Sequence, residues 1–236
     1  MIESFEQLKL QINQNIRRIQ AEIAIAAAES GRQADDITLM AVTKGFPAGY
    51  AAEAAKCGIT TFGENRVQEA LAKSAAPPNV RWEMIGTLQR NKVKNAVTVF
   101  QRIQSIDSIE LAQALNNAAQ TQQKQLEVLI QVNISGEASK HGVSPDMALR
   151  LGETIQSLPF LHGTGLMTIA PFAEDPQTIR WIFAELRAMR DTFQAHFGAS
   201  WQTLSMGMSH DFTAAIAEGA TLVRIGTALF GGRIKM

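Results

Sequence analysis

The chain has 236 residues, 46% of them hydrophobic, so it can bury a substantial core in one large domain or two small ones. Its 22 lysines and arginines balance its 22 aspartates and glutamates, which argues against a nucleic-acid binder or a basic membrane-surface protein. The single cysteine, Cys57, cannot form an internal disulfide and suits a reducing cytosol. Its setting in an alanine-rich run favours an inward-packed helix residue over a thiolate nucleophile. No apolar run is long enough for a membrane span, and the N-terminus does not resemble a signal peptide, so we expect a cytoplasmic protein.

The first predicted element is one long helix over residues 3–30. Its apolar positions recur at alternating steps of three and four, and they are Phe5, Leu8, Ile12, Ile16, Ile19 and Ile23. Gly31 follows as a terminator. The stripe would also suit a coiled-coil partner. The pattern lapses after Ile25, however, which favours a helix laid on its own domain.

Beyond this helix, eight short runs rich in Val, Ile, Leu, Met and Thr alternate with helical patterns. These candidate strands cover residues 37–44, 60–64, 81–86, 102–107, 126–135, 163–169, 203–208 and 222–231. Strand and helix in alternation imply parallel pairing through right-handed crossovers. Eight such units predict a closed (β/α)8 barrel of the TIM type, with an open doubly wound sheet as the alternative.

The domain organisation follows from the same count. Only GRIKM follows the last predicted strand, so we expect no eighth outer helix there and expect the N-terminal helix to cover that part of the barrel. No Pro- or Ser-rich linker divides the chain. We therefore expect a single domain over 1–236, with the helix in 1–31 and the barrel in 36–233.

In such a barrel the functional site lies at the carboxyl ends of the strands. Lys44 is the most unusual residue there, because it closely follows the apolar run LMAV. A lysine partly removed from water can lose its proton and condense with a carbonyl to form a Schiff base. A surface lysine at a strand end is the other interpretation, and position alone leaves both open.

A Schiff-base lysine in a barrel suggests either sugar-aldolase chemistry or pyridoxal 5′-phosphate, and the latter needs a phosphate cradle after strands seven and eight. Small and hydroxyl residues stand there, namely Ser205, Gly207, Ser209, Gly226 and Thr227. We also expect Asp211 to cap the helix that follows. Small residues serve helix packing too, so this pattern alone does not decide.

Eight sequence segments, found in a fixed order along the chain, together carry a specific resemblance to a known family. They are AVTKGFP, FGENRVQE, IGTLQRNKVK, IQSIDS, VLIQVNISGEASKHGV, GLMTIAPF, LSMGMSHDFTAAIAEGAT and VRIGTALFG. Together, from about residue 36 to residue 233, they resemble the YggS/PROSC family of pyridoxal-phosphate-binding proteins. That family is similar in fold to the N-terminal barrel of bacterial alanine racemase.

The resemblance implies a role for each matching residue. Lys44 would hold pyridoxal 5′-phosphate as a Schiff base, and Asn65 would sit beside its ring. Arg224 would face the pyridine nitrogen, and Met206 would lie against the cofactor. The phosphate would be bound by Ser209, Gly226 and Thr227.

Two positions depart from the family. An aromatic residue often stands where this chain has Arg66, and a histidine where it has Thr87. Lys140, after strand five, is either an exposed loop lysine or a second acceptor that assists transfer of the cofactor to other proteins.

The resemblance implies a protein of vitamin B6 homeostasis and amino-acid and keto-acid balance, without established catalysis. A racemase needs a second base on the other face of the α-carbon, and the only tyrosine, Tyr50, is expected to be a packing residue. The alternatives are a slow pyridoxal-phosphate-dependent racemase or related fold-type III enzyme, and a scaffold whose cofactor only signals. We expect a monomer whose partners are pyridoxal 5′-phosphate and apo-enzymes that use it, without metal, nucleic acid or membrane.

Overall fold

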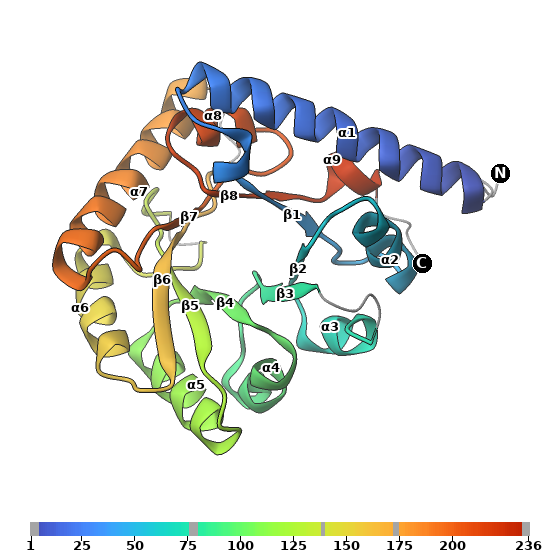
Figure 1. The fold of residues 1–236 in the computed structure, drawn as a ribbon. Helices are drawn as coiled ribbons and strands as arrows, with labels where there is room; N and C mark the ends of the chain where they lie inside the picture. Colours follow the sequence, from blue (N-terminus) through green and yellow to red (C-terminus); the bar gives the residue numbers. More distant parts are fainter. Residues whose placement is uncertain (1–4, 76–79, 138–139, 172–174, 233–236) are drawn as a thin grey trace.

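The computed structural model describes residues 5–75, 80–137, 140–171 and 175–232, and their centre is a closed barrel of parallel strands in the order β1 to β8 (Figure 1). The strands are β1 Thr38–Val42, β2 Thr61–Glu64, β3 Arg81–Met84, β4 Arg102–Ile106, β5 Leu126–Gln131, β6 Leu161–Met167, β7 Thr203–Ser205 and β8 Leu222–Ile225. β8 pairs with β1 and closes the barrel. The predicted fold class and all eight strands are confirmed.

Several strands end earlier than the sequence pattern predicts, and two predictions are wrong at their carboxyl ends. Residues 222–231 are not one strand, because β8 ends at Ile225 and a single helical turn, α9 Thr227–Phe230, follows it. Gly226 makes this bend close to β1, since a Cβ there would stand only 3.3 Å from the carbonyl oxygen of Val42. Residues 126–135 likewise stop being a strand after Gln131.

The outer helices follow the strands around the barrel (Figure 1). They are α2 Ala48–Lys56, α3 Val67–Lys73, α4 Val93–Val99, α5 Ile109–Thr121, α6 Pro145–Gln156, α7 Pro176–Phe197 and α8 Phe212–Ala217. Side chains mark two of their starts, because Ser108 accepts a hydrogen bond from the N–H of Leu111 and Asp175 caps α7 in the same way. Short 3-10 turns over Ala34–Asp36 and Arg90–Lys92 complete the element order.

The N-terminal helix α1, Phe5–Glu29, takes the place of an eighth outer helix. It packs on α8, on α9 and on α2, beside the strand that closes the barrel (Figure 1). Its stripe of Ile12, Ile16, Ile19 and Ile23 is buried in this contact. The expectation of a helix laid on its own domain is therefore confirmed. None of the helices within the described ranges is both long and apolar enough to span a membrane.

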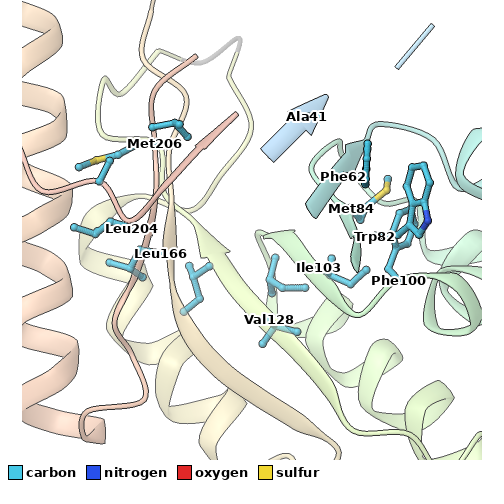
Figure 2. Packing of buried hydrophobic residues seen from close by; sticks show 14 of the residues in the cluster. Ala41, Phe62, Trp82, Met84, Phe100, Ile103, Val128, Leu166, Leu204 and Met206 are labelled. Carbon is cyan, nitrogen blue, oxygen red and sulfur yellow. The ribbon is translucent and has the colours of Figure 1, made fainter. Parts of the chain in front are cut away.

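The apolar core lies between the barrel wall and the helices. Phe62, Trp82 and Phe100 pack together there beside Ile103, and Met206 belongs to the same cluster (Figure 2). A small separate apolar cluster of Met40, Val42, Ile85 and Leu222 lies in the barrel interior. Much of the remaining interior is polar, and that polarity shapes the site.

Candidate functional site at the barrel mouth

Lys44 lies at the mouth of the barrel, two residues after β1 ends. Met40 and Val42 belong to the interior cluster, whereas Ala41 between them belongs to the outer core. Continued alternation therefore directs Lys44 towards the inner side of the mouth. Lys44 is partly buried.

A buried ion pair holds the residues that precede Lys44 and Asn65. The Lys73 ammonium on α3 donates to Oε1 of Glu64 at 2.6 Å and to the carbonyl oxygen of Thr43 at 2.8 Å. The Thr43 hydroxyl also donates to Oε1 of Glu64 at 2.6 Å. The ends of β1 and β2 are thus fixed to each other and to α3, so the network sets the backbone positions from which Lys44 and Asn65 project.

The Glu64 carboxylate in this network is fully buried, and its Oε2 has no hydrogen-bond partner within the described residues. Burial raises the pKa of Glu64, although the hydrogen bonds and charge of Lys73 act in the opposite direction. A second carboxylate supports the turn around Lys44, because Oε2 of Glu69 accepts a hydrogen bond from the N–H of Gly45 at 2.8 Å.

Arg224 extends from β8 into the barrel and is 4% exposed. Its Nη1 donates to the Ser205 hydroxyl at 2.7 Å and its Nη2 to the carbonyl oxygen of Thr168 at 2.8 Å. Neither acceptor is charged, and in the described part of the chain no carboxylate forms an ion pair with Arg224. Burial lowers the pKa of Arg224 to about 10, against the raising effect of the Asp211 charge. The guanidinium is therefore a buried positive charge at physiological pH.

The loop after β7 reaches the helical turn after β8 through Ser209, whose hydroxyl oxygen accepts a hydrogen bond from the N–H of Ala228 at 3.2 Å. Gly207 makes the loop compact, since its φ is +91° and a Cβ there would stand 2.7 Å from the Cβ of Ala215. Asp211 stands at the N-terminus of α8, but the predicted capping hydrogen bond with its side chain is not formed. Its carboxylate instead accepts a hydrogen bond from the N–H of Met208, the residue immediately before Ser209.

The predicted site residues come from neighbouring parts of the barrel wall. Lys44 follows β1, Arg224 lies on β8, the Gly226–Thr227 turn follows β8, and Ser209 follows β7. β8 pairs with both β1 and β7. Asn65 follows β2, which pairs with β1. The side chain of Met206 is fully buried in the outer core cluster (Figure 2).

A cavity of about 380 Å³ extends from Asn65 over the loops that follow β2 and β3. Both positions at which the sequence departs from the resembling family, Arg66 and Thr87, line it, together with Lys92. None of its lining residues is acidic. The two departures therefore act on one place beside the predicted site, where they give it a positive and polar lining.

The structure also shows the surroundings of Tyr50 and Lys140, two further residues that the sequence analysis considers. Tyr50 packs between the rings of Phe46 and Phe230 with centroid distances of 5.0 and 5.8 Å, as expected of a packing residue. Lys140 forms an ion pair with Glu137 at 3.2 Å. Over the described ranges, no group of three His, Cys, Asp or Glu side chains is arranged to hold a metal.

Sequence reasoning missed the polar residues that support the site. Glu83 and Gln104 are almost completely buried in strands and Lys73 is buried on α3. Glu64, which the sequence marks only as a polar residue at a strand end, is fully buried. A signal was present, because charged and amide residues interrupt the short apolar runs TTFGE, RWEMIG and RIQSID. Such interruptions inside barrel strands indicate a polar interior.

Taken together, the fold and the mouth define a class: a (β/α)8 barrel with a lysine, a buried arginine and a hydroxyl- and glycine-lined turn at the carboxyl ends of adjacent strands. The family model "Alanine racemase, N-terminal domain" matches residues 11–234. The pyridoxal phosphate homeostasis protein of Vibrio alginolyticus is 42% identical over 228 residues, covering 94% of this chain and 97% of its own. That of Aquifex aeolicus is 40% identical over 222 residues, covering 93% and 97%.

A solved structure gives the same picture. PipY of Synechococcus elongatus, solved with pyridoxal phosphate bound, is similar with a TM-score of 0.78 and 37% identity, over 89% of this chain and 100% of that one. The chain therefore belongs to the alanine racemase N-terminal domain family and, within it, to the group of the pyridoxal phosphate homeostasis proteins.

Proposed function

We propose that this protein binds pyridoxal 5′-phosphate at the barrel mouth, covalently through Lys44, and serves the homeostasis of that cofactor without catalytic turnover. The observation that carries the proposal is Arg224, a buried cation bound only to neutral acceptors within the described residues, on the strand beside Lys44. A ligand with an electron-rich ring nitrogen and a reactive aldehyde fits this pair. That PipY was solved with pyridoxal phosphate bound supports the choice of this ligand.

The chemistry of the mouth fits each part of that ligand. The amine of Lys44 would hold the aldehyde carbon through a carbon–nitrogen double bond, made with the loss of one water. Ser209, Gly226 and Thr227 bring hydroxyl groups and closely approaching backbone to one turn, which suits a phosphate. Asn65 is assigned to the edge of the ring. For Met206 we propose that the main chain makes the contact, because its side chain is buried in the core.

Two features favour a carrier over an enzyme. When bound, the cofactor would supply an electron sink for carbanions, and an arginine that is protonated at physiological pH and faces its nitrogen would weaken that property. Racemisation also needs a second proton donor, and the single tyrosine, Tyr50, is 9% exposed and enclosed by Phe46 and Phe230. Binding and release of the cofactor remain as the functions that this mouth supports.

Reconstitution with pyridoxal 5′-phosphate tests the proposal. The protein should develop a visible absorption band that borohydride fixes on Lys44, and Lys44→Ala should show only the spectrum of free cofactor. Lys56→Ala is the matched control, because Lys56 is an exposed lysine at the end of α2. A wild-type protein that stays colourless, or a Lys44→Ala variant that keeps the band, would contradict the assignment.

Solvent deuterium exchange at the α-carbon of a panel of amino acids separates carrier from enzyme. We expect no sustained exchange above the rate of free cofactor. Exchange at enzymatic rates would identify a racemase or a related enzyme instead.

We further propose that the loaded monomer passes its cofactor to apo-enzymes and that Lys140 assists this transfer. Lys140 lies in the loop that follows β5, where it forms an ion pair with Glu137. Lys140→Ala should keep the absorption band but slow the reactivation of an apo-enzyme. Equal reactivation rates would remove Lys140 from the proposal, and light scattering of the loaded protein would check the monomer.

A further inference from the structure

A continuous chain of hydrogen bonds crosses the barrel interior from Arg224 to Glu83. Nη1 of Arg224 donates to Oγ of Ser205 at 2.7 Å, and the Ser205 hydroxyl donates to Oε1 of Gln104 at 2.5 Å. Nε2 of Gln104 then donates to Oε2 of Glu83 at 2.6 Å. These residues come from β8, β7, β4 and β3, and all four are at most 4% exposed. The chain therefore links opposite walls of the barrel without access to water.

The direction of every donor in this chain is determined by its two ends. A guanidinium can only donate, and a carboxylate can only accept. The single Ser205 proton must therefore point to Gln104, and the Gln104 amide must turn its nitrogen to Glu83. Reversing either group would set two donors or two acceptors against each other in a dry interior, which is strongly unfavourable.

The Glu83 end is itself held firmly. Its Oε1 accepts from Nε of Arg81 at 2.6 Å and lies 3.6 Å from Nη1 of Arg102. Both arginines are bound in turn to the Glu127 carboxylate. The chain thus begins in a rigid cluster of charges at the amino ends of the strands and ends on one cation near the mouth.

We propose that Ser205, Gln104 and Glu83 are positioning residues for Arg224, which fix the plane of its guanidinium so that its other N–H groups meet the ring nitrogen of the ligand. A carboxylate in direct contact would also hold Arg224, but it would neutralise the charge there. Two neutral groups in between keep the negative charge at a distance, so the guanidinium is oriented and stays positive towards the mouth. The inference rests on the proposed function for the identity of the ligand, whereas the ordering of Arg224 is a property of the protein alone.

The first test needs no ligand. NMR of arginine side chains measures how fast the guanidinium nitrogens rotate, and the Arg224 signals are assigned by their loss in Arg224→Met. We expect slow rotation in the wild type and an acceleration of at least about tenfold in Ser205→Ala, since a buried hydrogen bond to a charged group is lost. Gln104→Met breaks the chain one link further away and should give a smaller change in the same direction.

Thr164→Val is the matched control, because it removes another buried hydroxyl of the barrel, one that donates to the carbonyl oxygen of Val128 and does not touch the chain. It should leave the Arg224 rotation rate at the wild-type value. Ser205→Thr retains the hydroxyl and should restore slow rotation. Wild-type rotation in both Ser205→Ala and Gln104→Met would overturn the inference, whether or not the protein binds the cofactor.

The second test uses pyridoxal 5′-phosphate labelled with ¹⁵N in the ring. The ring-nitrogen resonance of the complex should move in Ser205→Ala part of the way towards its position in Arg224→Met, and Thr164→Val should leave it unchanged. In the Arg224→Met background, Ser205→Ala should have no further effect, because the chain then has nothing to position. An equal effect in both backgrounds would show that Ser205 acts by packing and would overturn the inference, while cofactor binding itself would stand.

Discussion

The barrel interior carries arginines at both of its ends, and the two ends treat them differently. At the amino ends of the strands, Arg81 and Arg102 meet the carboxylates of Glu83 and Glu127, so two cations face two anions. At the carboxyl ends, Arg224 meets only neutral oxygens among the described residues. The amino end is a closed ionic cluster that serves stability, whereas the carboxyl end keeps a positive charge that a ligand can use.

The largest expected effect on the free energy of unfolding distinguishes the two ends of the barrel. Glu83→Met leaves Arg81 and Arg102 with a single carboxylate, and removing one partner of a buried ion pair costs about 3–5 kcal/mol. Arg224→Met replaces a buried cation, bound to no carboxylate in the described part of the chain, by an apolar group of similar length. It leaves no carboxylate without its cation, so its cost should be clearly smaller. Urea unfolding of the cofactor-free protein measures both. Equal losses would show that the two ends do not differ in the proposed way.

A further buried cation, Lys73, tests outside the barrel interior whether the loss of an ion-pair partner lowers stability. Lys73→Met leaves the Glu64 carboxylate, whose pKa burial already raises, without its cation, and should destabilise the protein by about 3 kcal/mol at pH 8. The folded state of the variant then holds a proton on Glu64 that the unfolded state releases, so its stability falls as the pH rises above the ordinary carboxyl range. The loss should be clearly smaller at pH 5. Lys56→Met, at an exposed lysine, should show no such pH dependence.

At Glu127 we expect a smaller contribution to stability, with a pH dependence opposite to that at Glu64. Burial pushes its pKa up, but the hydrogen bonds and charges of Arg81 and Arg102 together lower it below the usual value. The stabilisation it provides is therefore complete above the ordinary carboxyl pKa and is lost as the pH falls through the lowered value. Glu127→Gln should lose about 1 kcal/mol at neutral pH, because the group is partly exposed. Acid unfolding curves of variant and wild type should converge at low pH, and a constant gap between them would contradict this account.

The contrast between the two ends also explains what could be predicted from the sequence. Periodicity located all eight strands and the helix over Ile12, Ile16 and Ile19, because each apolar face must be buried against a neighbouring element. It failed at the end of β8, where close approach to Val42 ends the strand although the apolar pattern continues through Leu229 and Phe230.

Some residues of the candidate site could also be predicted from the sequence, and others could not. Lys44 and Arg224 could be found because they stand at strand ends or match motifs of a resembling family. The chain through Ser205, Gln104 and Glu83 could not, because its members are far apart in sequence and acquire partners only when the barrel closes. Their polarity inside strands was visible, but the pairing depends on register and on which way each side chain points, and a single sequence does not contain either.

The smallest expected effect concerns Ser209, on the same end of the barrel as Arg224 but neutral. Ser209→Ala loses one hydroxyl that accepts the N–H of Ala228, and a single neutral hydrogen bond contributes about 1 kcal/mol, or roughly fivefold in affinity. We expect the affinity for pyridoxal 5′-phosphate to fall by about that factor, while the visible band of the saturated protein is unchanged, since Lys44 still forms the link. Thr213→Ala, an exposed hydroxyl on α8, is the matched control. Equilibrium titration of the three proteins measures the difference. A loss much larger than fivefold would contradict the assignment of a single neutral hydrogen bond to Ser209.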